Sequence, residues 1–125
     1  MTKIDRIYLV GPRGSGKTAV GRLLAERLGC KFLDADVELE ARAGRSIADI
    51  FAVECESGFR EREATLLADL ARLDRHVIAC GGGIVLRPDN RERLRNTGFC
   101  VWLAGEPATL SRRIDCDPKI GRAHV

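Results

Sequence analysis

The sequence lacks any apolar run of the roughly 20 residues that a transmembrane helix needs. It also lacks the apolar segment of a secretory signal peptide, because Asp5 and Arg6 interrupt the N-terminus at once. Neither sign of charge dominates, since 21 Lys and Arg residues stand against 18 Asp and Glu residues. The resulting formal net charge of +3 is too small to indicate a nucleic-acid partner. We therefore expect a cytoplasmic protein with no membrane partner and no nucleic-acid partner.

The positions of the cysteine, histidine and aromatic residues argue against a metal site, a disulfide framework, a catalytic histidine and a surface that stacks on nucleic-acid bases. The five cysteines are odd in number and form no C-x-x-C pair, so we expect reduced thiols rather than a metal site or a disulfide framework. His76 and His124 have no catalytic partners in the sequence. Arg91, Arg93 and Arg95 form the densest basic stretch, but no aromatic residues alternate with them, as stacking on bases would require.

The chain of 125 residues has room for one domain with a single core. Apolar runs alternate with stretches of helical periodicity, which is typical of a parallel sheet covered by helices on both faces. We expect strands at 7–10, 31–33, 76–79 and 99–103. We expect helices at 17–28, 37–43, 47–73 with a break near Ser57-Gly58, 88–95 and 107–114. The predicted fold class is therefore α/β.

One stretch carries a specific motif. Residues 11–18 read G-P-R-G-S-G-K-T and fit G-x-x-x-x-G-K-[ST], the phosphate-binding loop, between a predicted strand and a predicted helix. Glycines let the backbone curl so that successive N–H groups point inward, and the helix adds its positive N-terminal end. In this motif Lys17 reaches the β- and γ-phosphates, and the Thr18 hydroxyl holds Mg²⁺. We expect a chain that binds a nucleoside triphosphate or descends from one that did.

Two further clusters follow predicted strands, at the edge where open parallel sheets bind their ligands. Asp34 and Asp36 come after the second strand, and alternation along an extended chain would point their side chains in different directions. Alternatively, one of them caps the following helix. Gly81-Gly82-Gly83 after the third strand leaves the backbone free to approach a small ligand, or forms a flexible turn. Arg60 is not singled out by its spacing, because the sequence 60–63, R-E-R-E, is typical of a solvated helix face.

Together these motifs resemble those of the shikimate kinase family, from about Arg6 to Arg113. The matching residues are G-x-x-G-x-G-K-T, then F-x-D-x-D (Phe32, Asp34, Asp36), then I-F-x-x-x-x-E-x-x-F-R (Ile50, Phe51, Glu56, Phe59, Arg60), then G-G-G. One departure lies inside the third motif, where Cys55 stands in place of the glycine that usually precedes Glu56.

The resemblance implies a P-loop kinase fold, a three-layer α/β/α core with strand order 2-3-1-4-5. It implies Mg²⁺-dependent transfer of the γ-phosphoryl group of ATP to the 3-hydroxyl of shikimate, in aromatic amino-acid biosynthesis. By this resemblance the ATP phosphates are bound by Gly14, Ser15, Gly16, Lys17, Thr18 and Ala19. Mg²⁺ is held by Thr18, with Asp34 acting through water. Asp36 binds shikimate hydroxyls and accepts the proton, Arg60 pairs with the carboxylate, and Gly81, Gly82 and Gly83 line the shikimate site.

The C-terminus departs further from the family. The expected lid with its arginine, a later shikimate-binding arginine, the fifth strand and the last helix have no counterpart. Residues 120–125, I-G-R-A-H-V, correspond in frame to ATC GGA AGA GCA CAC GTC, part of a widely used sequencing adapter, so we expect the domain to span 1–119. We expect this truncated chain to be weakly active or inactive, and the complete protein to be a monomer.

Two other functions stay open. One is another small-molecule P-loop kinase, such as a gluconate or nucleoside monophosphate kinase, and the joint occurrence of Asp36, Arg60 and the three glycines argues against it. The other is a nucleotide-binding module without catalysis, and the retention of Lys17 and Asp36 argues against that.

Overall fold

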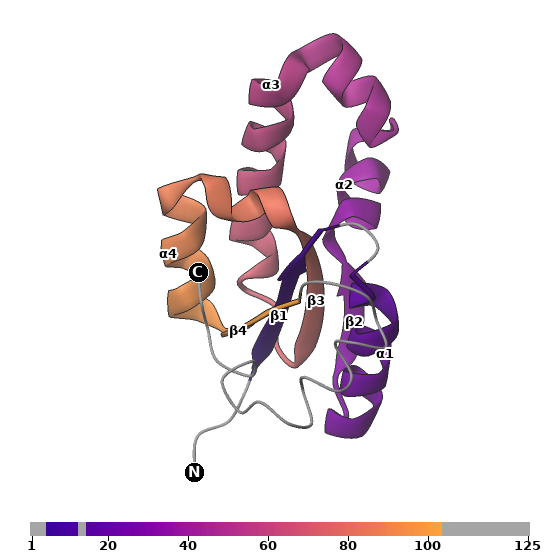
Figure 1. The fold of residues 1–125 in the computed structure, drawn as a ribbon, viewed down its shortest axis with the longest axis vertical. Helices are drawn as coiled ribbons and strands as arrows, with labels where there is room; N and C mark the ends of the chain where they lie inside the picture. Colours follow the sequence, from indigo (N-terminus) through magenta and orange to yellow (C-terminus); the bar gives the residue numbers. More distant parts are fainter. Residues whose placement is uncertain (1–4, 13–14, 104–125) are drawn as a thin grey trace.

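The computed structural model describes residues 5–12 and 15–103. The predicted helix at 107–114, the predicted domain end at 119 and the six-residue tail lie outside the described residues. The elements in chain order are β1 (Arg6–Gly11), α1 (Lys17–Leu28), β2 (Lys31–Asp34), α2 (Ala35–Ala43), α3 (Ile47–Leu70), β3 (His76–Gly81), the 3-10 helix η1 (Gly82–Leu86), α4 (Pro88–Thr97) and β4 (Phe99–Trp102). Figure 1 shows how these elements are arranged.

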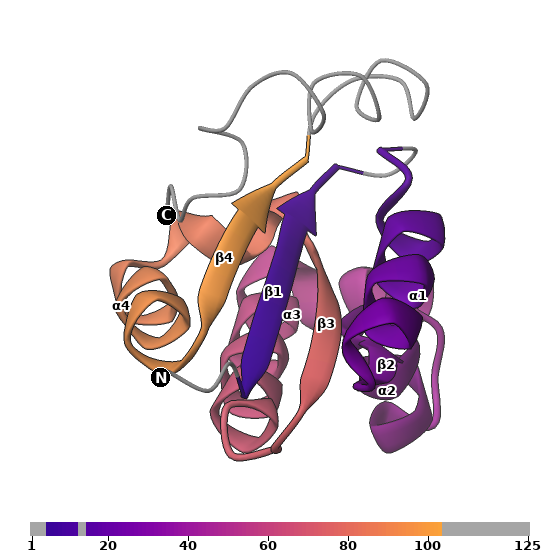
Figure 2. The same ribbon diagram turned by 90° about the horizontal axis from the view of Figure 1, so that it is seen from below.

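The four strands form one parallel sheet in the order β2-β3-β1-β4. Ile7 of β1 lies opposite Val77 of β3 on one side and Phe99 of β4 on the other. In Figure 2 the arrows of β4, β1 and β3 run side by side in the same direction. The predicted α/β class is confirmed, and so are the first four positions of the predicted strand order. The fifth position of that order, for which we expect no strand in this chain, is not tested by the residues that the structure describes.

Side chains of the central strands alternate between two hydrophobic clusters, as the pleat of a strand requires. Tyr8 and Val10 of β1 pack into the larger cluster, which α2, α3 and α4 supply with buried side chains. Ile7 and Leu9 of the same strand pack into the smaller cluster, beneath α1. Helices therefore cover both faces of the sheet, which makes the three layers that the fold class predicts.

The predicted helix boundaries are mostly correct because local capping determines them. Gly29 and Gly44 adopt left-handed conformations, with φ of 67° at each, and they end α1 and α2. The Ser46 hydroxyl accepts a hydrogen bond from the Asp49 N–H and begins α3. The second helix starts at Ala35, two residues earlier than predicted, because Asp34 caps it.

The break in α3 differs from the prediction. It lies at Cys55, with φ of 63° and ψ of −174°, and not at Ser57-Gly58, which are helical. Figure 1 shows α3 bent at the top of the molecule, with its first part following α2 and its second part descending toward the sheet. The sequence signal for a break was the glycine, but the bend uses a residue three positions earlier.

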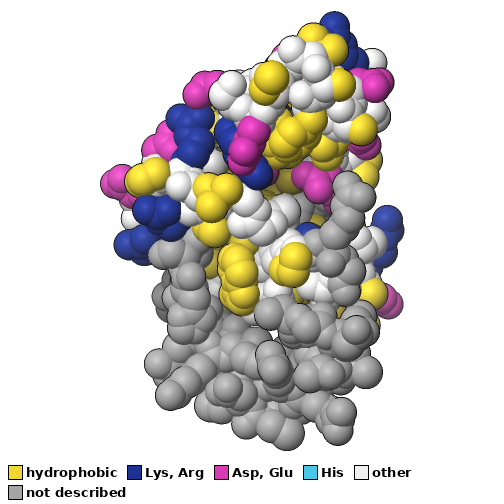
Figure 3. Space-filling view, turned by 45° about the horizontal axis from the view of Figure 1, so that its top comes forward, with side chains coloured by type: hydrophobic (Ala, Val, Ile, Leu, Met, Phe, Trp, Pro, Cys, Tyr) yellow, Lys and Arg dark blue, Asp and Glu magenta, His cyan; other side chains and the backbone are white. Residues whose placement is uncertain are grey.

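Charged side chains on the surface are mixed in sign. On the face shown in Figure 3, Lys and Arg side chains lie among Asp and Glu side chains, with hydrophobic side chains between them. Arg42 pairs with Glu38 and Asp69, and this joins α2 to α3. Over residues 5–12 and 15–103, none of the helices combines the length and the apolar character that crossing a membrane would require.

Candidate functional site

The phosphate-binding loop joins β1 to α1. Gly16 is the N-cap of α1 with φ of 85°, a left-handed conformation that favours glycine. No side chain caps this helix and no acidic residue lies in its first turn, so the first N–H groups of α1 are left for an anion. The Ser15 hydroxyl is buried and has no hydrogen-bond partner among the described residues. These observations fit a bound phosphate group; Gly14 lies outside the described residues.

Lys17 lies over the loop that it follows. Its Nζ donates hydrogen bonds to the carbonyl oxygens of Gly11 and Pro12. Lys17, Thr18 and Ala19 line a cleft of about 400 Å³ together with Asp34, Asp36 and residues of the loop. The structure thus brings the predicted phosphate-binding residues from Ser15 to Ala19 together with both predicted carboxylates.

Asp34 and Asp36 take different structural roles, but the prediction that alternation along a strand would separate their side chains was wrong. Residues two apart in a strand share a face, and Asp36 lies in a helix. Asp34 ends β2, and its Oδ1 accepts hydrogen bonds from the N–H groups of Asp36 and Val37, at 2.9 and 3.2 Å. It is therefore the N-cap of α2, the alternative that the sequence left open. Asp36 lies in the first helical turn, so it reaches the cleft from a helix instead of from the strand.

A magnesium site would take few protein ligands here. Within the described part of the chain, no group of three or more His, Cys, Asp and Glu side chains is placed to hold a metal ion. Mg²⁺ keeps several water ligands and is commonly bound by one or two protein groups plus substrate phosphates. The Thr18 hydroxyl and the Asp34 carboxylate border the cleft and fit that sparse pattern.

The three glycines bring the end of β3 close to both charged groups of the site. Gly81 ends the strand and lies against Asp36, since an added Cβ would come 3.8 Å from its Oδ2. Gly82 and Gly83 belong to the tight helix η1 instead of a flexible turn. An added Cβ on Gly83 would fall on the guanidinium of Arg60, with Cζ at 2.6 Å. Glycine at 83 therefore makes the space that Arg60 occupies.

Arg60 comes from the second part of α3 and is held by acidic neighbours. Its Nη1 donates to Glu63 Oε1 at 3.0 Å, and its Nε lies 3.5 Å from Glu56 Oε1. Its guanidinium lies 5.1 Å from the centroid of the Phe59 ring. The Nε has no hydrogen-bond partner among the described residues, although it is buried. A guanidinium that retains an unused N–H donor is suited to bind a carboxylate.

Glu63 is the site residue that the sequence analysis missed. Residues 60–63 were interpreted as a solvated helix face, but Glu63 is buried with 6% exposure. Burial raises the pKa of its carboxyl, and the hydrogen bond from Arg60 opposes that rise. The only signal available was the three-residue spacing from Arg60, which exposed helical pairs share.

Asp36 connects the phosphate cleft to a second pocket. That adjoining pocket is lined by Asp36, Glu63, Cys80, Gly81, Ile84 and apolar residues of α2 and α3. Burial raises the pKa of the Cys80 thiol, with nearby Glu63 and Asp36 adding to the effect, so Cys80 stays protonated. Asp36 thus borders the phosphate cleft on one side and, on the other, a mostly apolar cavity of about 10 Å³ that Glu63 also lines and that has room for about one water molecule.

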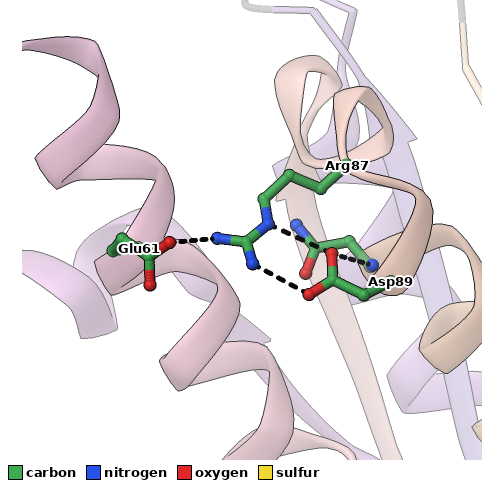
Figure 4. Close-up of polar contacts among 4 residues, drawn as sticks. Glu61, Arg87 and Asp89 are labelled. Carbon is green, nitrogen blue, oxygen red and sulfur yellow. Dashed lines mark hydrogen bonds and ion pairs between the residues drawn. The ribbon is translucent and has the colours of Figure 1, made fainter.

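The η1 segment is fixed to α3 from the outside. Arg87, which follows η1, donates to Glu61 of α3 at 2.8 Å and to both carboxylate oxygens of Asp89 in α4. Figure 4 shows the Arg87 guanidinium lying between the two carboxylates. The two carboxylates are exposed and Arg87 is half-buried, so these ion pairs add little to the stability of the fold.

Comparison with known families shows to which family the chain belongs. The family model for shikimate kinase matches residues 13–125, which is most of the chain. The chain belongs to the shikimate kinase family. Among curated shikimate kinases, one from Symbiobacterium thermophilum is 64% identical over 107 residues, covering 86% of this chain. One from Thiobacillus denitrificans is 52% identical over 113 residues, covering 90% of this chain. In both cases the chain spans 62% of the relative's length.

Solved structures agree with the family assignment. A shikimate kinase from Acinetobacter baumannii, solved in complex with shikimate, has a TM-score of 0.80 and 43% identity. The alignment covers 93% of this chain and 66% of that one. A gluconokinase from Sinorhizobium meliloti has a TM-score of 0.56 at 22% identity, which shows a shared fold and no more.

Proposed function

We propose that this protein transfers the γ-phosphoryl group of ATP to the 3-hydroxyl of shikimate, with Mg²⁺, as a step of aromatic amino-acid biosynthesis. The observation that carries the proposal is the position of Asp36. Its carboxylate borders the phosphate cleft and lies against Gly81, two residues before Gly83, which lies against the Arg60 guanidinium. A hydroxyl held between Asp36 and the phosphate cleft would have a proton acceptor on one side and the phosphates on the other.

We assign each residue a role that its position supports. The loop N–H groups, Ser15 and Lys17 bind the phosphates and neutralise charge on the transferring group. Thr18 and Asp34 would hold Mg²⁺, which supplies further neutralisation when it is bound. Arg60 binds the substrate's carboxylate as a fork of donors, with Glu63 fixing its orientation. Asp36 accepts the hydroxyl proton as the phosphoryl group is transferred.

The test measures ADP release with shikimate, gluconate and nucleoside monophosphates as competing acceptors. We expect release that depends on shikimate, and we expect Asp36→Asn to lower kcat by about 100-fold or more with little change in MgADP affinity. Arg60→Lys should mainly raise the KM for shikimate, because lysine cannot replace a planar fork. Preference for another acceptor would contradict the proposal. MgADP binding without any acceptor-dependent release would favour a non-catalytic module.

We further propose that the complete protein acts as a monomer in the cytoplasm. The substrate and the nucleotide are small soluble molecules, and the phosphate-binding residues and both carboxylates line a single cleft. Sedimentation of the complete protein at working concentrations should give a single monomeric species, and a dimer whose partner contributes to the cleft would contradict this.

A further inference from the structure

The bend in α3 places a residue in a backbone conformation that it rarely adopts. Cys55, at φ 63° and ψ −174°, lies in a region that is almost restricted to glycine. Such a conformation persists only where the surrounding structure enforces it. Contacts that join the two parts of α3 across Cys55 are therefore needed to explain the bend.

Glu54 and Arg62 make such a contact. Arg62 Nε and Nη2 donate to the two carboxylate oxygens of Glu54, at 2.9 and 2.8 Å. The two residues are eight positions apart, and a straight α-helix would separate them by about 12 Å along its axis. The bend between the two residues brings them close enough for both hydrogen bonds to form. Arg45 adds a weaker contact, with Nη1 at 3.9 Å from Glu54 Oε2.

Gly58 permits the close approach. An added Cβ on Gly58 would fall on the Cβ of Glu54 and lie 2.9 Å from its Oε1. In a straight helix the Cβ atoms of residues four apart are about 5–6 Å from each other. The bend thus folds Glu54 over residue 58, and the absence of a side chain there leaves room for Glu54 to reach Arg62.

The bend in turn sets the surroundings of Arg60. Phe51, before the bend, stacks on Phe59, after it, with ring centroids 4.7 Å apart. The Arg60 guanidinium lies over the same Phe59 ring. A change in the angle between the two parts of α3 would move Phe51 against Phe59 and alter the support of Arg60. Glu54 and Arg62 line neither the phosphate cleft nor the adjoining pocket, so any effect on substrate would be indirect.

We propose that Glu54 and Arg62 form a brace across the bend of α3 and are positioning residues that fix Arg60 for the carboxylate of the substrate. This inference rests on the proposed function for the identity of that carboxylate. The hydrogen bonds from Arg62 lower the pKa of Glu54, so the brace is a full ion pair at neutral pH. Partly exposed ion pairs add little to stability on their own, so the brace holds the bend together with the packing of Phe51 against Phe59.

The experiment compares Glu54→Gln with Arg62→Gln. If the brace positions Arg60, both variants should weaken shikimate binding about three- to tenfold, in calorimetry and in KM, with kcat and MgADP affinity nearly unchanged. If only long-range charge mattered, the two would differ in sign, because removing the negative Glu54 would strengthen the binding of an anionic substrate. Amide hydrogen exchange over residues 56–60 should become faster in both variants.

Two further variants complete the design. Exchanging the pair, Glu54→Arg with Arg62→Glu, should restore most of the affinity and the slow exchange. The control is Arg42→Gln. Arg42 lies in α2, its side chain is 47% exposed against 40% for Arg62, and it pairs with Asp69 of α3, away from the bend. This substitution should change neither the affinity for shikimate nor the amide exchange over residues 56–60.

Unchanged affinity in both single variants, opposite effects of the two, or an equal loss in Arg42→Gln would each overturn the brace. If the unaltered protein bound no shikimate, the proposed function and the role of the pair toward substrate would both fail. The exchange rates over residues 56–60 would then still decide whether the pair holds the bend, so the two failures are distinguishable.

Discussion

At the scale of single residues, Gly83 gives the sharpest prediction. Its backbone leaves the space that the Arg60 guanidinium fills, so Gly83→Ala would displace Arg60 from Glu63. We expect the KM for shikimate to rise about tenfold or more, since a charge-assisted fork to a carboxylate is worth a few kcal/mol. MgADP affinity should stay unchanged. Gly81→Ala is the comparison, because its Cβ would make ordinary contact with Asp36 and should cost less. Equal effects of the two substitutions on KM would contradict this reading.

The sequence predicted residues of this site only where a motif carried them. The loop from Ser15 to Thr18 was predicted from its own spacing, because backbone geometry and glycine positions determine that structure locally. Arg60 required resemblance to a family, and Glu63 was interpreted as solvated. Burial of Glu63 depends on how α3 packs against η1 and β3, and no local pattern in the sequence encodes that packing.

A second prediction at this scale concerns pH. Burial raises the pKa of the Cys100 thiol to about 11, and it raises the pKa of Cys80 and Tyr8 as well. A thiol in an unfolded chain ionises near pH 8.5, so between about pH 8.5 and 11 the unfolded state has released a proton that the folded state retains. Stability is therefore fully present below that window and is lost as the pH rises through it.

We expect the free energy of unfolding, measured with urea, to fall by about 2 kcal/mol from Cys100 alone between pH 7.5 and pH 10. Cys100→Ala should remove that part of the pH dependence, whatever it does to stability at pH 7.5. A flat profile, or one unchanged by the substitution, would show that Cys100 is not shielded from water. Thiol labelling at pH 7.5 gives an independent check, since exposed Cys55 should react before Cys80 and Cys100 do.

At the scale of elements, the bend in α3 makes a prediction about stability. Cys55 occupies a backbone region that costs a residue other than glycine about 1–3 kcal/mol. Glycine adopts that region freely but loses about 0.5–1 kcal/mol to greater freedom in the unfolded chain. We therefore expect Cys55→Gly to raise the free energy of unfolding by about 1 kcal/mol. Cys55→Ala is the matched control, because alanine keeps the strain and should give no such gain. If Cys55→Gly instead lowered the free energy of unfolding, the backbone at residue 55 would carry no strain, and the prediction would be wrong.

The same element shows why sequence alone misplaced the bend. Gly58 predicted a helix break because glycine disfavours a helix interior. Its backbone is nevertheless helical, and the absence of a side chain there leaves space for Glu54. Cys55 carried no turn signal of its own, and only its departure from the family motif set it apart. Caps were easier to predict, since Ser46 and Gly44 act through contacts with their immediate neighbours.

At the scale of the whole molecule, the alternation of strands and helices predicted the architecture well. A parallel pair requires a crossover connection, and helices that cross over cover both faces of the sheet. The order β2-β3-β1-β4 did not follow from alternation alone, because several orders satisfy it; resemblance to the family supplied it. The proposed function rests on the site, where the phosphate-binding loop, the segment after β3 and the bent helix α3 meet.

The last prediction concerns how much of the reaction the 125-residue chain can perform. Among the described residues that line the phosphate cleft, Lys17 is the only cation. Transfer of a phosphoryl group relies on several positive groups around the transferring oxygens and on exclusion of water by a closing segment. With Lys17 as the one cation among the described lining residues, we expect the 125-residue chain to bind MgADP but to phosphorylate shikimate about 100-fold more slowly than a shikimate kinase whose site holds further positive groups.

A chimera provides the measurement, with residues after Leu103 replaced by the corresponding C-terminal part of the Symbiobacterium relative. We expect the chimera to recover kcat while its MgADP affinity changes little. A chimera that also carries Lys17→Met should lose that recovery, because the added segment cannot replace the loop cation. If the 125-residue chain by itself matched the turnover of the full-length relative, the groups within the described cleft would suffice for catalysis, and the need for a closing segment would be wrong.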